Sequence, residues 1–341
     1  MKSGHGGHGG HGGHSDHAGR QLRIARLLLW VTPALWSSNY LIARAAEGVI
    51  TPHLLALGRW SLAFAIMLPF AWTALARDGM PWRREWKQLL VLGALGMWIC
   101  GAIVYIGGQT TSSTNIGLIY AAAPIAIAVA GTRLLHERIA RAQAAGIALA
   151  LAGVVFVIAK GSLGNLLTVR LTPGDGWIAI AMASWVVYSV LLKRWPSTLE
   201  PLPRLVAICA GGILVLLPFT ALEWWLAPRL PLTPAALGLV VLAALLPGVL
   251  SYPAYSFMQR ELGVARTALV MYLAPVYAAF GAWFVLGEHP RWYHAVGAAL
   301  ILPSIWLATR GAATGPPPPP PSLSLPEPAP EPAGVVLRPR G

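Results

Sequence analysis

The sequence predicts an all-α integral membrane protein with ten transmembrane helices, arranged as two five-helix repeats of inverted topology. Three observations lead to this fold class: an apolar composition, ten apolar runs of helical length, and an internal repeat. Of the 341 residues, 56% are hydrophobic and only 11% are charged, whereas about a quarter of the residues in soluble domains are charged. This composition excludes a soluble enzyme, a fibrous protein and a mostly disordered chain, because so little charge cannot cover a water-exposed surface.

The ten apolar runs are each 16–23 residues long, close to the length of about 20 residues with which a helix crosses the hydrocarbon core. Transmembrane β-strands would be half as long and would alternate apolar with polar residues. The predicted spans, in chain order, are Leu27–Ala43, Leu54–Ala76, Leu89–Ile106, Ser113–Thr132, Ala142–Ala159, Trp177–Leu192, Leu205–Leu222, Leu237–Tyr255, Ala265–Leu286 and Tyr293–Ala308.

The internal repeat appears when the two halves are aligned at an offset of about 150 residues. The aligned pairs include Trp36 with Trp185, Pro69 with Pro218, Tyr105 with Tyr255, Gln109 with Gln259, Pro124 with Pro275 and Glu137 with Glu288. Matches of Trp, Gln, Pro and Glu in one order are hard to obtain by chance. Each repeat holds an odd number of spans, so the second repeat enters the membrane from the opposite side, as in many secondary transporters.

The basic residues predict the orientation of the bundle. With the N-terminus in the cytoplasm, 19 of the 25 Lys and Arg, including Arg266 at the edge of the ninth span, fall in the segments expected inside, and 5 in those expected outside. This bias follows the positive-inside rule and also places the C-terminus in the cytoplasm. The net charge of +13 is therefore assigned to membrane orientation, and we expect the lipid bilayer rather than nucleic acid as the partner.

The domain boundaries follow from the repeat and from the composition of the two ends. The first repeat covers residues 24–159, a linker loop covers 160–174, and the second repeat covers 175–309. We expect a disordered Gly/His-rich tail at 1–23 and a disordered Pro-rich tail at 310–341, because neither end has apolar side chains to anchor a fold.

The N-terminal tail carries the only candidate metal ligands. Neutral imidazoles bind zinc, nickel or copper, while the alternative is a solvated low-complexity arm without a metal. The histidines are His5, His8, His11, His14 and His17. The two cysteines, Cys100 and Cys209, have no CxxC neighbour and are interpreted as small apolar fillers, so no cofactor is expected.

Several motifs resemble those of the drug/metabolite transporter superfamily and, within it, the EamA-type transporters. They are the Trp-x-x-Asn motif of Trp36–Asn39, Arg59 in the second span, and an Ala-Pro…Glu pattern that ends the fourth and ninth spans. Trp-x-x-Tyr, at Trp185–Tyr188, replaces the first motif in the second half. The resemblance covers about residues 24–309 and implies a multi-pass carrier of the bacterial inner membrane, often an exporter of amino acids or other metabolites.

Polar and aromatic side chains near the middle of two equivalent spans are the leading candidates for a substrate cavity. They are Trp36, Ser38 and Asn39 in the first span, and Trp185 and Tyr188 in the sixth. Polar groups at membrane depth face the bundle interior or a wet cavity, and inverted repeats place their substrate near the midplane. The alternative is that these side chains bridge and pack helices. Secondary candidates, each of which could equally be an interfacial anchor, are Tyr105, Tyr120, Tyr252, Tyr255 and Tyr272.

Arg59 is the one basic side chain well inside a predicted span. It is a candidate anchor for an anionic substrate group such as a carboxylate, because a charge at this depth needs a partner. The alternative is a structural contact with Glu47 or with a backbone carbonyl.

Two acidic residues and two prolines complete the predicted sites. Glu137 and Glu288 end the fourth and ninth spans and are candidate gates, with helix-end solvation as the alternative. Pro124 and Pro275 lie about 13 residues earlier and are candidate kinks that would free backbone carbonyls toward a cavity.

The sequence lacks the Walker A, HExxH and GxSxG motifs, so we expect no enzyme activity. The function that remains is secondary transport of small metabolites by alternating access, with a membrane scaffold or metal sensor that uses the His-rich tail as the alternative. No Asp, Glu or His lies centrally in any predicted span, which favours facilitated diffusion or exchange over obligatory proton antiport. The oligomeric state is left open.

Overall fold

The computed structural model describes residues 12–77, 82–111, 116, 119–120, 122–135, 139–162, 164–167, 172–227, 230–269, 271–274, 276–277 and 291–310. Residues 1–311 form one unit, and all of the structure described below belongs to it.

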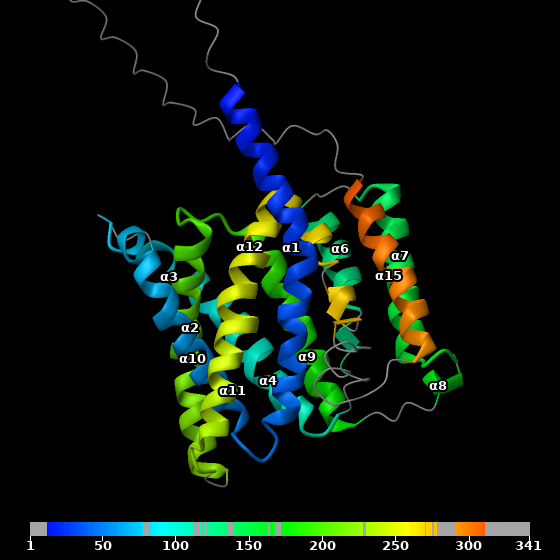
Figure 1. The fold of residues 1–341 in the computed structure, drawn as a ribbon. Helices are drawn as coiled ribbons and strands as arrows, with labels where there is room; N and C mark the ends of the chain where they lie inside the picture. Colours follow the sequence, from blue (N-terminus) through cyan, green and yellow to red (C-terminus); the bar gives the residue numbers. More distant parts are fainter. Residues whose placement is uncertain are drawn as a thin grey trace, which may run out of the picture. The chain divides into compact units, whose positions relative to one another are not determined.

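Every described element is a helix (Figure 1). The first half contains α1 (Gly12–Ala45), α2 (Pro52–Leu75), α3 (Trp82–Gly93), the π-helix η1 (Ala94–Ile99), α4 (Cys100–Gly108), α6 (Ala123–Leu134), α7 (Arg141–Ile158) and α8 (Gly164–Leu167). The second half contains α9 (Pro173–Arg194), α10 (Pro201–Leu226), α11 (Pro234–Ala244), the π-helix η2 (Leu245–Leu250), α12 (Ser251–Leu262), α13 (Val264–Thr267) and α15 (Trp292–Arg310). The prediction of an all-α multi-pass protein is confirmed at this level.

Five described helices are long and apolar enough to cross a membrane. They are Pro52–Leu75, Trp82–Gly108, Pro173–Arg194, Pro201–Leu226 and Pro234–Leu262, and they overlap the second, third, sixth, seventh and eighth predicted spans. Shorter apolar helices, Ala123–Leu134, Arg141–Val157 and Ala295–Ser304, overlap the fourth, fifth and tenth. The first predicted span lies within α1, and most of the ninth lies outside the described residues.

Two boundaries differ from the sequence prediction. Helix α1 begins at Gly12, so residues 12–23 are helical where a disordered tail was predicted. The predicted linker loop contains the short helix α8 (Gly164–Leu167) and the first turn of α9.

Pro124, a predicted kink, lies in the first turn of α6. A missing N–H removes no hydrogen bond within α6 at this place.

The two halves share their succession of helices. In each half a π-helix, η1 or η2, interrupts the third long apolar helix at positions 151 residues apart. In each half the preceding helix, α2 or α10, begins with a proline and contains an interior one, Pro69 or Pro218. The repeat seen in the sequence is therefore also a repeat of local backbone geometry.

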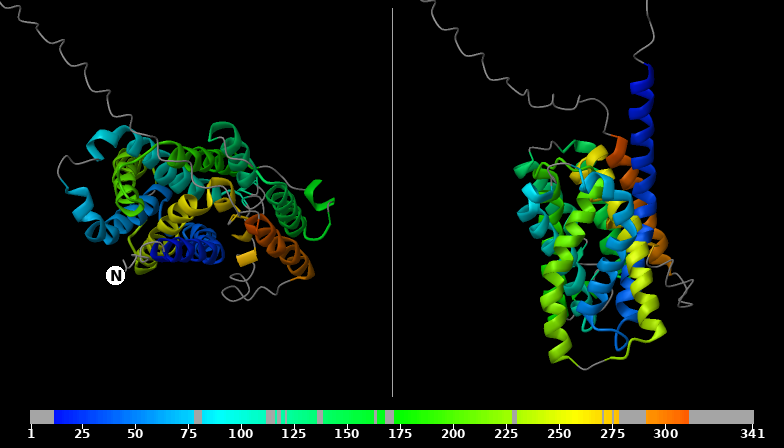
Figure 2. Two further views of the ribbon diagram at one scale, coloured as in Figure 1. Left: turned by 90° about the horizontal axis from the view of Figure 1, so that it is seen from above. Right: turned by 90° about the vertical axis from the view of Figure 1, so that its left-hand side faces the viewer.

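The contacts between the halves are reciprocal. Helix α1 packs on α12 and its counterpart α9 packs on α4; likewise α3 packs on α10 and α11 packs on α2. Two equivalent pairs, α2 with α10 and α7 with α15, pack on each other. Figure 1 shows α7 beside α15, and the view from above in Figure 2 agrees. This exchange of partners is the pattern that a two-fold relation between the halves produces.

Glycines allow α3 and α10 to approach until their backbones touch. A Cβ atom added to Gly93 would lie 2.3 Å from the backbone nitrogen of Gly212, and one added to Gly212 would lie 2.5 Å from the Cβ of Met97. Helices in a bilayer gain little from the hydrophobic effect and associate through such close packing. The two halves are thus held together at a place where only glycine fits.

In each half, the start of the second long helix is held by a carboxylate from the other half. Glu223, near the end of α10, accepts hydrogen bonds from the backbone N–H of His53 at 3.0 Å and pairs with His53 Nδ1 at 2.9 Å, at the start of α2. Glu85 of α3 accepts from Ser197 Oγ at 2.6 Å and from the N–H of Thr198 at 2.9 Å, just before α10. An anionic group beside a helix N-terminus is stabilising, because unpaired N–H groups and the helix dipole meet there.

The substitution Gly93→Ala is expected to destabilise the protein strongly. A methyl group 2.3 Å from a backbone nitrogen must push α3 away from α10, and overpacking of this kind costs about 1–3 kcal/mol or more. The matched control is Gly238→Ala, since a Cβ at that helical glycine meets nothing within 4 Å. The thermal unfolding midpoints of both variants in detergent measure the difference; equal midpoints would contradict the close approach of the two helices.

Candidate functional site

A cavity of about 70 Å³ lies among helices of both halves. Its lining residues come from α1, α2, α4, α9 and α12 and from short segments of the fourth and ninth predicted spans. They are Trp36, Asn39, Tyr40, Arg59, Cys100, Val104, Tyr120, Trp185, Tyr252, Met271 and Ala274. Arg59 is the one charged residue among these lining residues, so the cavity combines one cation with a largely aromatic wall.

Arg59 is only 3% exposed and is held by neutral groups. Its Nη1 donates to Asn39 Oδ1 at 3.2 Å and to Tyr105 Oη at 3.1 Å, and its Nη2 donates to the carbonyl of Pro247 at 3.0 Å. Its Cζ lies 4.5 Å from the ring centre of Trp60. Arg59 thereby links α2 to α1, to α4 and to the π-helix η2 of the other half.

No carboxylate in the described part of the chain forms an ion pair with Arg59. Its Nε is buried and has no hydrogen-bond partner among the described residues. Of the two structural contacts that the sequence allowed, the backbone carbonyl is present, from Pro247, and Glu47 is not among the groups that contact Arg59. Among the described residues, Arg59 is thus a buried cation held only by neutral oxygens, and a charge buried in this way is costly unless a negative group pairs with it.

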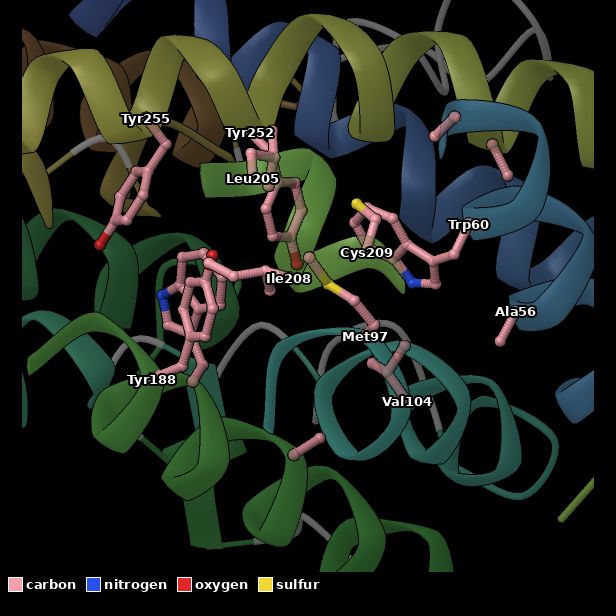
Figure 3. Packing of buried hydrophobic residues seen from close by; sticks show 14 of the residues in the cluster. Ala56, Trp60, Met97, Val104, Tyr188, Leu205, Ile208, Cys209, Tyr252 and Tyr255 are labelled. Atoms are coloured by element: carbon pink, nitrogen blue, oxygen red, sulfur yellow. The ribbon is translucent and has the colours of Figure 1, made fainter. Parts of the chain in front are cut away.

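The aromatic wall joins the two halves at equivalent positions. The ring centres of Trp36 and Trp185 are 5.2 Å apart in an edge-to-face arrangement, and Tyr255 lies 5.0 Å from each. Tyr252 lies 6.0 Å from Trp36 and 5.8 Å from Trp185, and Tyr188 stacks on Trp185 at 5.3 Å. Edge-to-face and offset pairs at these distances are favourable. In Figure 3, Tyr252 and Tyr255 project from α12 toward the side on which Tyr188 of α9 lies.

The cavity brings together about half of the residues predicted to line it. The predicted residues that line it are Trp36, Asn39, Arg59, Tyr120, Trp185 and Tyr252. The other predicted residues lie outside the lining. Ser38 Oγ donates to the carbonyl of Leu35 in its own helix, and the hydroxyl of Tyr105 contacts Arg59. Tyr188 and Tyr255 are fully buried in the main core, and Tyr272 belongs to a separate small cluster with Ala150 and Ile301.

Sequence reasoning missed five of the lining residues. Tyr40 follows Asn39 directly, Cys100 was interpreted as a filler, and the side chains of Val104, Met271 and Ala274 carry no nitrogen or oxygen atom. Cys100 begins α4 immediately after the π-helix η1. A π-turn shifts the helical phase of the residues that follow it, so a 3.6-residue period does not predict which face of α4 meets the cavity.

Several predicted sites cannot be placed. Glu137, Glu288 and Pro275 lie outside the described residues, as do His5, His8 and His11. His14 and His17 lie in α1, but their side chains are not described. Among the described residues there is no group of three or more His, Cys, Asp or Glu that could hold a metal ion, so the gate and metal interpretations stay predictions.

A multi-pass helical protein that encloses a cavity between two repeats has the architecture of a membrane transporter rather than an enzyme. The model of the EamA-like transporter family matches the chain twice, over residues 23–159 and 172–310. The chain therefore belongs to the EamA-like transporter family, and the resemblance inferred from its motifs is confirmed.

Relatives with transporter names support this assignment. An uncharacterized transporter of Archaeoglobus fulgidus is 24% identical over 83% of this chain and 96% of its own length. A probable terminal-alkyne amino-acid exporter of Streptantibioticus cattleyicolor is 27% identical over 67% of this chain and 75% of its own. An S-adenosylmethionine/S-adenosylhomocysteine transporter of Chlamydia trachomatis is 22% identical over 78% of this chain and 83% of its own.

A solved crystal structure shares the fold. It aligns with a TM-score of 0.68 and 20% identity over 85% of this chain and 99% of that one. At this identity the likeness concerns the fold alone.

The two cysteines allow the cavity to be tested chemically. Cys100 lines the cavity and is partly exposed, while Cys209 is fully buried in the core. We expect a small methanethiosulfonate reagent to modify Cys100 at least about tenfold faster than Cys209, because a buried thiol is reached only after local opening. Mass spectrometry of the Cys100→Ser and Cys209→Ser variants measures the two rates separately. Faster modification of Cys209 would contradict the placement of the cavity.

Proposed function

We propose that this protein is a secondary transporter of small carboxylate-bearing metabolites, namely amino acids or related compounds, and that it works as an exporter. The observation that carries the proposal is Arg59, a buried cation with no carboxylate partner among the described residues, at a cavity formed by both repeats. A substrate carboxylate would supply the missing negative charge, and charge-assisted hydrogen bonds to arginine are strong and directional.

The aromatic wall supports a substrate with an organic body as well as a carboxylate. Rings from Trp36, Tyr40, Tyr120, Trp185 and Tyr252 surround the cavity. Such rings bury apolar groups, and their faces attract ammonium or sulfonium groups. Among the relatives, one is named an amino-acid exporter and another an S-adenosylmethionine/S-adenosylhomocysteine transporter, and each of these compounds contains an amino-acid group.

Alternating access between two inverted repeats is the proposed mechanism. The reciprocal helix contacts and the two equivalent π-helices support a two-fold relation between the halves, and an odd number of spans per half makes that relation an inversion. In this arrangement the N- and C-termini are cytoplasmic and the protein lies in a bacterial inner membrane. Glu137 and Glu288, at equivalent ends of the fourth and ninth spans, are the proposed gates.

Transport by exchange or facilitated diffusion is the proposed mode of coupling. The described cavity lining contains no Asp, Glu or His that could carry a proton between the two sides. His53 and Glu223 form a titratable pair, but their place at the beginning of α2 and near the end of α10 puts them at one end of the bundle. A carrier without a central titratable group moves its substrate down a gradient or against a second substrate.

The first test is flux into proteoliposomes preloaded with members of an amino-acid panel. We expect counterflow of at least one amino acid and a loss of about 10- to 100-fold in its initial rate in Arg59→Gln, which removes a charged hydrogen-bond donor from a buried site. The initial rate of Arg59→Lys is expected to lie between those of the wild type and Arg59→Gln. A lysine keeps the charge, but one ammonium group cannot replace the several hydrogen-bond donors of the planar guanidinium.

The matched control is Arg141→Gln, which removes an exposed cation at the start of α7 and should leave the flux unchanged. Normal flux in a correctly inserted Arg59→Gln variant would show that Arg59 has only a structural role. The absence of any substrate-dependent flux would favour the scaffold or metal-sensor alternative.

The second test concerns topology. We expect reporter fusions after Arg84, Arg138 and Arg194 to lie in the cytoplasm, and fusions after Ala45 and Leu166 to lie on the external side. The reason is that basic residues concentrate in the segments assigned to the cytoplasm. Paired alkaline phosphatase and green fluorescent protein fusions give opposite signals at each site. A reversed signal at any one site would break the inversion between the two halves.

A further inference from the structure

A second concave site lies away from the cavity, in a groove of about 410 Å³ between α2, α3 and α10. Every side chain that lines it is apolar, and its lining includes Trp72, Trp82, Trp86, Ala207, Ala210 and Leu214. Several of these side chains are open to the surroundings: Trp72 is 58%, Trp86 is 52% and Leu214 is 63% exposed. In a membrane protein such a surface is covered by lipid or by another protein.

The groove follows from the way α3 meets α10. The two helices touch through Gly93, Gly211 and Gly212. Toward the beginning of both helices, Ala207 and Ala210 face α3 with small side chains, and the space beside them is bounded by the large rings of α2 and α3. A narrow apolar trough with tryptophans gathered at one end suits an acyl chain, because tryptophan accumulates at the level of lipid head groups.

Cations stand beside the tryptophan end of the groove. Arg83, Arg84 and Lys87 are exposed on the first turns of α3. The Cζ of Arg83 lies 5.4 Å from the ring centre of Trp82, and the Nζ of Lys87 lies 5.7 Å from that of Trp86. None of the three cations forms an ion pair with a carboxylate in the described part of the chain.

The acidic residue in this stretch offsets only one of these charges. Both carboxylate oxygens of Glu85 accept hydrogen bonds from Ser197 and Thr198, before the start of α10. The rim of the groove therefore presents three cations against one carboxylate, which leaves it with a positive charge.

From this combination we infer that the groove is a binding site for one anionic phospholipid. Its acyl chain lies in the trough between α2, α3 and α10, and its phosphate contacts Arg83, Arg84 and Lys87. Basic clusters beside membrane helices attract anionic head groups, and the apolar trough adds a hydrophobic contribution that is the same for neutral lipids of equal chain length.

A second copy of the chain fits the groove less well than a lipid does. Two copies in one membrane lie at the same depth, so a symmetric contact through this face would bring the cationic turn of α3 close to the same turn of its partner. Like charges brought together are destabilising, whereas an anionic lipid neutralises them.

The test is native mass spectrometry of the full-length protein after titration with phosphatidylglycerol or phosphatidylcholine that carry identical acyl chains. We expect phosphatidylglycerol to bind at least about fivefold more tightly, and the variant R83Q/R84Q to lose about tenfold or more of that affinity. The control R133Q/R141Q removes two exposed cations from another cytoplasmic connection and should retain the wild-type affinity.

A second variant tests the trough itself. Ala210→Phe fills the floor of the groove and should lower the binding of both lipids, while Ala221→Phe, at an exposed position of the same helix, should not. Equal binding of the two lipids, or equal behaviour of R83Q/R84Q and its control, would overturn the proposal. So would an Ala210→Phe variant that abolishes a dimer and leaves lipid binding unchanged, since the groove would then be occupied by a second copy.

Discussion

The burial of Arg59, without a carboxylate partner in the part of the chain that the structure describes, is the constraint on which the rest of the structure depends. A charged group taken from water into an apolar interior is costly unless its donors are satisfied. Here the two terminal nitrogens donate to an amide oxygen of α1, a phenol of α4 and a carbonyl of η2, while Nε has no partner among the described residues. Three separate parts of the chain must therefore meet at the same point as α2, and that point borders the cavity.

The π-helices explain how this meeting is possible. Arg59 reaches the carbonyl of Pro247, which lies inside η2, where a π-turn alters the regular pattern of helical hydrogen bonding. The equivalent η1 in the first half leads directly into Cys100 at the cavity. The repeat therefore has a structural consequence at the cavity. One π-helix supplies a carbonyl to Arg59, and the other immediately precedes Cys100 in the lining. Only the first half carries the arginine, since the position equivalent to Arg59 is Ile208, and Arg59 is the one charged residue among the lining residues of the cavity.

The two halves are joined by close packing at one place in the bundle and by carboxylate hydrogen bonds at others. Glycines bring α3 and α10 into backbone contact, and Glu223 and Glu85 hold the chain at the beginning of α2 and before α10. These contacts all join one half to the other. A transporter that works by rocking one repeat against the other would have to change some of them, and exposed or helix-end hydrogen bonds open more readily than a glycine contact between two helix backbones. The helix-end carboxylates are therefore better placed than the glycines to exchange partners during a transport cycle.

The sequence by itself determined the class of fold, the positions of most apolar helices and the existence of the repeat, because hydrophobic run length and ordered matches of rare residues are local properties of the chain. It also singled out Trp36, Asn39, Arg59 and Trp185, since polar and aromatic groups in the middle of an apolar run need a partner inside the bundle. Only the tertiary structure decided that Arg59 is held by neutral oxygens, that Pro124 lies in the first turn of α6, and that Tyr188, Tyr255 and Tyr272 lie outside the cavity. These outcomes depend on how helices are rotated against one another and on the phase shift at the two π-turns, and neither is encoded in the spacing of residues along one helix.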